Sequence, residues 1–206
     1  MRKADVYLRL GCLGCGNQKV EVLTDEQNLA SLCTQHDRKA EDELYTRYAG
    51  RIYALCLRYC GDRDDARDLL QETFIKALGN IATFRYRGEG SLYAWIRRIA
   101  VNMALNKIRA RRFRFIPLDL SGADAAEDPP DESVSMVPER ELLRMISELP
   151  EMKRAVFNMY CIDDYSHSEI AEALGITEKG SASILSKAKA QLRERVRDYI
   201  RHSEIR

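Results

Sequence analysis

The chain has 206 residues, of which 33 are basic and 32 acidic, so its formal net charge is +1. This length suffices for one medium domain or two small ones, and the balanced charge does not by itself indicate a partner. No apolar run reaches the ~18–20 residues of a membrane span, and the N-terminus lacks the apolar core of a signal peptide. We therefore expect a cytoplasmic protein without membrane insertion. Its six cysteines should be reduced core residues or metal ligands rather than disulfides.

Apolar residues recur at helical spacing along most of the chain, which predicts an all-α fold; a short alternating stretch at 18–23 is a candidate strand. The string Thr-Asp-Glu-Gln at 24–27 has the pattern of a capping box that opens a short helix through Leu29 and Leu32. A second helix is expected from Arg38 to Tyr59. Its predicted buried face consists of Leu44, Tyr45, Tyr48, Ile52, Leu55 and Tyr59.

A third helix is predicted after Gly61, with Asp62 or Asp64 as its cap. Its apolar stripe is formed by Ala66, Leu69, Leu70, Thr73, Ala77 and Leu78. The opposite face carries Asp65, Asp68, Gln71, Glu72 and Ile75, with a single cation, Lys76, at the end. A surface made of acids and amides differs from the mixed charge of most amphipathic helices, although a charged face is usually only solvated.

A loop from Gly79 to Gly90 and a fourth helix from Ser91 to Arg112 follow, and here aromatic rings alternate with cations. The rings are Phe84, Tyr86, Tyr93 and Trp95, and the cations are Arg85, Arg87, Arg97, Arg98, Lys107, Arg109, Arg111 and Arg112. Stacking combined with backbone neutralisation is the chemistry that holds unstacked single-stranded bases. Gly88 and Gly90 would let the backbone approach a flipped base closely. Alternatively, Trp95 is a core residue and the basic run is simply solvated.

Residues 116–137 contain three prolines and many acids but no lysine or arginine, which predicts an extended linker. Pro138 and Pro150 then open two further helices. Ser166 to Glu169 form a capping-box pattern, Gly175 turns the chain, and Thr177 can cap the next helix. A helix, a short glycine turn and a basic helix are typical of a helix-turn-helix, whose second helix enters the major groove of DNA.

The early residues of this recognition helix are expected to face base edges and the later cations to contact phosphate. The candidate DNA contacts are Thr177, Glu178, Lys179, Ser181, Ser183, Ser186, Lys187 and Lys189. Gly180 inside the helix costs ~1 kcal/mol relative to alanine. The early part of the helix has few long side chains, so readout by methyl groups, backbone and DNA shape is also expected.

This order of elements resembles the extracytoplasmic-function (ECF, group four) sigma factors of bacterial RNA polymerase, from about Asp25 to Arg201. The family string D-x-x-Q-E-x-F is met by Asp68, Gln71, Glu72 and Phe74. The family pattern R-G-E-G-S-F-x-x-W-L-x-R-I-A-x-N is met with Leu92 in place of phenylalanine, by Arg87, Gly88, Glu89, Gly90, Ser91, Trp95, Ile96, Arg98, Ile99, Ala100 and Asn102.

The resemblance implies that Asp68, Gln71, Glu72 and Phe74 bind the coiled coil of the largest polymerase subunit. It implies that the loop 87–91 captures a base of the −10 promoter element and that the helix after it helps to open the duplex, with Trp95, Arg98, Asn102, Lys107 and Arg109 as further contacts. The helix-turn-helix would bind the −35 element, and the acidic linker would be a tether or a phosphate mimic inside polymerase. An anti-sigma factor is a further expected partner.

The sequence thus predicts two small all-α domains, at 24–113 and 138–206, joined by an acidic flexible linker at 114–137 and preceded by a flexible tail at 1–23. We expect no catalytic residues, metal or cofactor, because no catalytic motif accompanies the histidines. Two alternatives remain open. One is a helix-turn-helix regulator that acts without polymerase. The other is a zinc- or redox-controlled sigma factor that uses Cys12, Cys15, Cys33 and His36.

Overall fold

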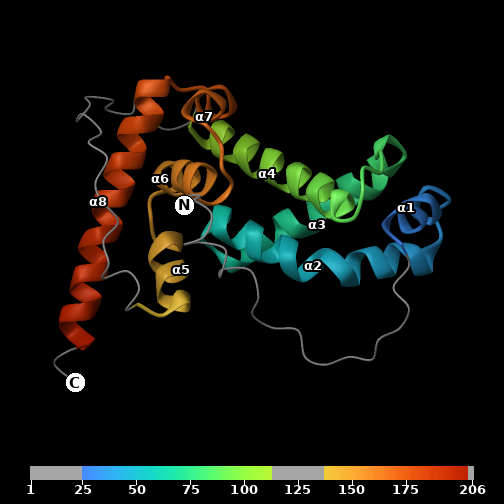
Figure 1. Ribbon diagram of the computed structural model, residues 1–206, viewed down its shortest axis with the longest axis horizontal. Coiled ribbons are helices and arrows are strands. Elements are labelled where there is room, and N and C mark those ends of the chain that lie inside the picture. Colours follow the sequence, from blue (N-terminus) through green and yellow to red (C-terminus); the bar gives the residue numbers. More distant parts are fainter. Residues whose placement is uncertain (1–24, 113–136, 204–206) are drawn as a thin grey trace. The chain divides into compact units, whose positions relative to one another are not determined.

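In the computed structural model, residues 25–112 and 137–203 are described, and every regular element within these ranges is helical (Figure 1). The all-α prediction is therefore confirmed. The candidate strand at 18–23 and nearly all of the acidic linker lie outside the described residues. The elements are α1 (Glu26–Thr34), α2 (Arg38–Cys60), α3 (Arg63–Asn80), the 3-10 turn η2 (Ile81–Thr83), α4 (Ser91–Arg112), α5 (Glu139–Ser147), α6 (Glu151–Phe157), the π-helical turn η4 (Asn158–Ile162), α7 (His167–Leu174) and α8 (Glu178–Ser203).

The described residues form two compact units. The N-terminal unit contains residues 25–57 and 62–104, and the C-terminal unit contains residues 137–203 together with 58–61 and 105–112. Within these ranges, each helix is too short or too polar to cross a membrane.

Helix α3 shows how the N-terminal unit follows from its sequence. The carboxylate of Asp62 accepts hydrogen bonds from the backbone N–H groups of Asp64 and Asp65, at 2.8 and 3.0 Å, and these bonds hold the pKa of Asp62 below its usual value. This confirms Asp62 as the cap. The predicted stripe is buried from Ala66 to Ala77, so the acids and amides face outwards. Helix α2 differs from expectation at Tyr45, which is 44% exposed at the edge of its apolar face.

Helix α1 begins differently from the predicted capping box. Asp25 is its N-cap and makes no side-chain cap bond, and Thr24 lies outside the described residues. Glu26, the first residue of α1, is buried with 9% exposure. Its carboxylate accepts hydrogen bonds from residues of α2 and α4.

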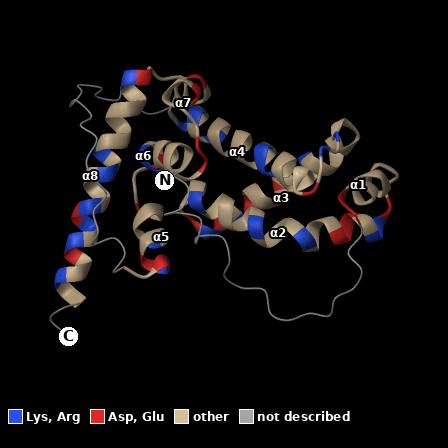
Figure 2. Ribbon diagram, viewed as in Figure 1, with Lys and Arg blue, Asp and Glu red and all other residues tan. Residues whose placement is uncertain are grey.

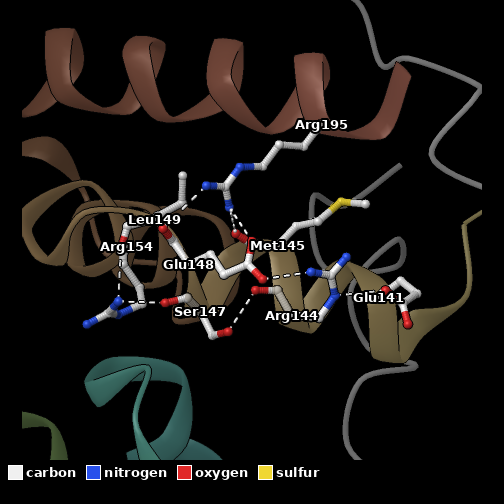
Figure 3. A network of polar contacts seen from close by, with 8 residues as sticks. All are labelled: Glu141, Arg144, Met145, Ser147, Glu148, Leu149, Arg154 and Arg195. Carbon is white, nitrogen blue, oxygen red and sulfur yellow. Dashed lines mark hydrogen bonds and ion pairs between the residues drawn. The ribbon is translucent and has the colours of Figure 1, made fainter. Parts of the chain in front are cut away.

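The C-terminal unit packs α6 and α7 against the long helix α8. A polar network joins α5 to α8 (Figure 3). Arg195 of α8 donates to the carbonyl of Met145 at 2.8 Å and lies 3.2 Å from the carboxylate of Glu148. Glu148 also pairs with Arg144 at 2.7 Å. Buried Arg154 donates to the carbonyls of Ser147 and Leu149 at 2.7 and 2.9 Å, which satisfies backbone groups at the end of α5 (Figure 3).

The predicted helix-turn-helix is present in α7 and α8. Ser166 and Glu169 form a complete capping box, so the predicted start of α7 is confirmed. Gly175 ends α7 in the left-handed region, with φ of 65°. The hydroxyl of Thr177 then accepts the backbone N–H of Gly180 at 3.0 Å and caps α8 as expected.

Candidate polymerase and DNA interfaces

The outer side of α3 presents one continuous exposed surface, here called the α3 face, made of Asp68, Gln71, Glu72 and Ile75. Ile75 is 72% exposed, more than the other exposed large hydrophobic side chains of the described residues, Tyr45 and Tyr86. Phe74, expected to be a contact residue together with Asp68, Gln71 and Glu72, is instead 4% exposed. Its ring packs on Tyr45 with centroids 4.8 Å apart. Phe74 therefore supports the α3 face from the core.

The loop before α4 is built around two glycines. Gly88 and Gly90 have φ of 114° and 84°, values that residues with a Cβ rarely adopt. The loop is closed by a hydrogen bond from the Arg87 N–H to the Ser91 hydroxyl at 3.3 Å. The side chains of Arg87 and Glu89 are exposed. The loop thus presents a cation, an acid and open backbone to solvent.

Glu26 contacts the helix that follows this loop, a relationship that local pattern analysis of the sequence missed. One carboxylate oxygen accepts the backbone N–H of Leu92 at 3.1 Å, and the other accepts the hydroxyl of Tyr48 at 2.8 Å. Burial, followed by the hydrogen bond to Glu26, raises the pKa of Tyr48 to about 12, so this hydroxyl keeps its proton at neutral pH.

Helix α4 has an exposed and a packed side. Arg98, Asn102 and Arg109 are exposed, and Lys107 is half-buried. Trp95 is half-buried, with its ring tilted against Phe84 at a centroid distance of 5.7 Å. Trp95 therefore packs against the segment that leads into the loop.

Helix α8 carries lysines and arginines along its length (Figure 2). Thr177 precedes it and is exposed, as are Glu178 and Lys179 in its first turn and Lys187 further along. Ser186 and Lys189 are half-buried.

The structure buries two residues that were expected to face base edges, Ser181 with 0% and Ser183 with 7% exposure. The Ser181 hydroxyl instead lies 2.9 Å from Nδ1 of His167, which is half-buried. Burial argues against direct base contact by these two serines.

Comparisons with known proteins match both units. The Sigma-70 region 2 family matches residues 44–114, and the Sigma-70 region 4 family matches residues 139–192. The ECF RNA polymerase sigma-E factor of Haemophilus influenzae is 34% identical over 165 residues, which cover 75% of this chain and 85% of the relative. The RNA polymerase sigma-H factor of Pseudomonas aeruginosa is 32% identical over 74% of this chain and 85% of the relative. The ECF RNA polymerase sigma-E factor of Salmonella typhimurium is 30% identical over 88% and 98%, respectively.

The chain belongs to the ECF sigma factors of the sigma-70 family. It directs promoter recognition and transcription initiation by RNA polymerase as a non-enzymatic subunit, which confirms the function predicted from the sequence. The region 2 match covers the α3 face and the loop 87–91, and the region 4 match covers the helix-turn-helix.

In this sigma factor, Cys33 and His36 differ sharply in environment. Cys33 is 1% exposed, and burial, with Glu41 and Asp37 nearby, raises the pKa of its thiol to about 11. The side chain of His36 is 85% exposed and lies 3.6 Å from Glu41. Within the described ranges, no cluster of three or more histidine, cysteine, aspartate or glutamate side chains has an arrangement that could hold a metal ion. Cys12 and Cys15 lie outside those ranges. The zinc or redox alternative needs all four of these residues and therefore stays a prediction.

Proposed function

We propose that this sigma factor docks on core RNA polymerase through the α3 face. Its acids and amide supply charge and hydrogen-bonding groups, and Ile75 supplies apolar area at the same surface. The observation that carries this proposal is that Asp68, Gln71 and Glu72 are exposed together on one side of α3, within the residues that match the Sigma-70 region 2 family. Ile75 adds a single exposed apolar side chain to that surface. Phe74 acts indirectly, by holding the helix on the core.

For the −10 element, we propose that the loop 87–91 receives an unpaired base, with Gly88 and Gly90 giving room and Arg87, Glu89 and Ser91 giving polar contacts. Arg98, Asn102 and Arg109 on the exposed side of α4, together with Lys107, would contact the backbone and bases beside it. Support comes from their exposure and from the two glycine conformations. Trp95 would contribute by packing on Phe84.

For the −35 element, we propose that the exposed start of α8 enters the major groove. Thr177, Glu178 and Lys179 would meet DNA first, and Ser186, Lys187 and Lys189 would follow along the helix. Ser181 and Ser183 are left out of this contact set because they are buried. With so few long side chains at the start of α8, DNA shape would contribute to readout.

An anti-sigma factor and a cytoplasmic location are proposed on family membership alone. The linker between the two matched regions would connect them within polymerase, as a tether or by mimicking phosphate with its acids.

Run-off transcription with bacterial core polymerase tests the polymerase contact. The template carries the −35 and −10 sequences from upstream of this protein's own gene, and wild type is compared with the double variant Gln71→Ala/Glu72→Ala. The expected result is transcription by wild type and its loss in the variant, together with loss of core binding. The matched control is Gln27→Ala/Asn28→Ala, which changes two exposed polar residues of α1 and should transcribe normally. Wild-type levels of transcription and core binding in the double variant would overturn the proposal.

A further inference from the structure

The first turn of α4 needs a capping group that its own sequence does not supply. The first N–H groups of a helix lack intrahelical partners and are usually satisfied by a side chain at the N-cap. Here Gly90 occupies that position and has no side chain. The N–H of Ser91 finds the carbonyl of Gly88 at 3.2 Å, and that of Ala94 finds the carbonyl of Gly90 at 3.0 Å. The N–H of Leu92 is satisfied by the carboxylate of Glu26, 66 residues earlier in the chain.

The Glu26 carboxylate is itself fixed in place. Glu26 is the first residue of α1 and is 9% exposed. The hydroxyl of Tyr48 in α2 donates to the second oxygen of the Glu26 carboxylate at 2.8 Å. The ring of Tyr48 stacks on Tyr93 in the first turn of α4 at 6.2 Å, and Arg51 lies 3.6 Å above the Tyr93 ring. Helices α1 and α2 therefore hold the start of α4 by a charged hydrogen bond and by ring contacts. A carboxylate at this end is also favoured by the helix dipole.

We propose that Glu26 is a positioning residue for −10 recognition, with Tyr48 as its support. By capping α4 from another helix, Glu26 allows a glycine to stand at the N-cap and keeps the loop 87–91 in its open, left-handed conformation. The proposal rests on the proposed role of that loop. Glu26 lies before the residues that match the region 2 family, which begin at 44.

The test compares Glu26→Leu with Glu26→Gln. Leucine fills a similar volume but accepts no hydrogen bond. Glutamine keeps an acceptor for the Leu92 N–H, and its amide can donate to the Tyr48 oxygen. Promoter opening is followed with reconstituted holoenzyme by the fluorescence of 2-aminopurine placed in the −10 element. Core binding is measured separately, and circular dichroism checks folding.

With Glu26→Leu, we expect opening to slow about tenfold, the usual scale for a lost helix cap, and core binding to change by less than about twofold. Glu26→Gln should stay within about threefold of wild type, and Tyr48→Phe should fall between the two. The control Gln27→Ala, an exposed change in the same turn, should match wild type. If Glu26→Leu opens promoters normally, or loses core binding to the same extent as opening, the positioning role is wrong. Equal defects in the leucine and glutamine variants would also overturn it.

A loop variant separates this inference from the proposed function. Arg87→Ala/Glu89→Ala changes the loop itself and should also slow opening without loss of core binding. If this variant opens promoters as wild type does, the proposed −10 role of the loop is wrong. If it is defective while Glu26→Leu is normal, the loop role stands and the positioning role of Glu26 alone is overturned.

Discussion

The hydroxyl of Ser181 lies 2.9 Å from Nδ1 of His167 and joins the two helices of the helix-turn-helix. Ser181 is fully buried near the start of α8, and His167 is the first residue of α7. The ring of Tyr160 stacks on the imidazole with centroids 4.5 Å apart. These contacts set the spacing of the two helices and thereby the presentation of the first turn of α8.

Replacing Ser181 with alanine should therefore destabilise the fold. The loss of one hydrogen bond is expected to lower the free energy of unfolding by about 1 kcal/mol, measured by urea denaturation. Binding of the holoenzyme to a −35 duplex should weaken without a change in the preferred sequence. Ser168→Ala, an exposed change beside His167, is the control. Unchanged stability together with an altered sequence preference would show instead that Ser181 reads a base.

The presence of the helices and many of their ends could be predicted from the sequence, because the spacing of apolar residues and the capping residues are local features of the chain. Helix α4 was expected from Ser91 to Arg112 and is found there. Ser166 was identified as a cap, and the cap of α3 was narrowed to Asp62 or Asp64, because capping depends on residues within one turn. At 24–27 the helix start lies one residue later than the predicted cap, with Asp25 as the N-cap, and Thr24 lies outside the described residues.

The candidate site was predicted only in part, since exposure depends on packing between distant segments. The acids and amides of α3 lie outside as expected, but Phe74 is buried against Tyr45. Ser181 and Ser183 are small enough to be buried in α8, and helical spacing alone did not distinguish them from the exposed residues around them. The link between Glu26 and Leu92 joins positions 66 residues apart and has no local signal.

The neighbours Phe74 and Ile75 should behave in opposite ways when changed. Phe74→Ala leaves a cavity under α3 and should lower the free energy of unfolding by about 3–5 kcal/mol. Ile75→Ser removes an exposed side chain and should change stability by less than about 0.5 kcal/mol, but it should weaken binding to core polymerase. Urea denaturation and a core-binding assay distinguish the two effects. If Ile75→Ser binds core polymerase as wild type does, the isoleucine lies outside the interface.

Replacing Gly175 should lower the free energy of unfolding because of its backbone conformation. Its φ is 65°, and an added Cβ would meet nothing within 4 Å, so sterics with neighbours play no part. Gly175→Ala should lower the free energy of unfolding by about 1–2 kcal/mol, because the Cβ of an L-amino acid lies too close to the following carbonyl oxygen in the left-handed region. Gly175→Asn should cost less, since asparagine tolerates that region. Equal destabilisation by alanine and asparagine would point to a steric cause instead.

The capping box of α7 predicts a pH dependence of stability. Glu169 accepts hydrogen bonds from the backbone N–H and the hydroxyl of Ser166, at 2.8 and 2.7 Å, and these bonds hold the pKa of its carboxyl below the usual value. A group whose pKa is lower in the folded state than in the unfolded state stabilises the fold above the unfolded pKa. Its contribution is lost as the pH falls through the folded pKa.

The thermal midpoints of wild type and Glu169→Ala should therefore differ most at neutral pH and converge between about pH 5 and pH 3. The exposed Glu172→Ala change on the same helix is the control for loss of an acid, and it should remain close to wild type across the range. A gap between wild type and Glu169→Ala that stays constant in acid would mean that side-chain packing or helix propensity, and not the ionised cap, stabilises the start of α7.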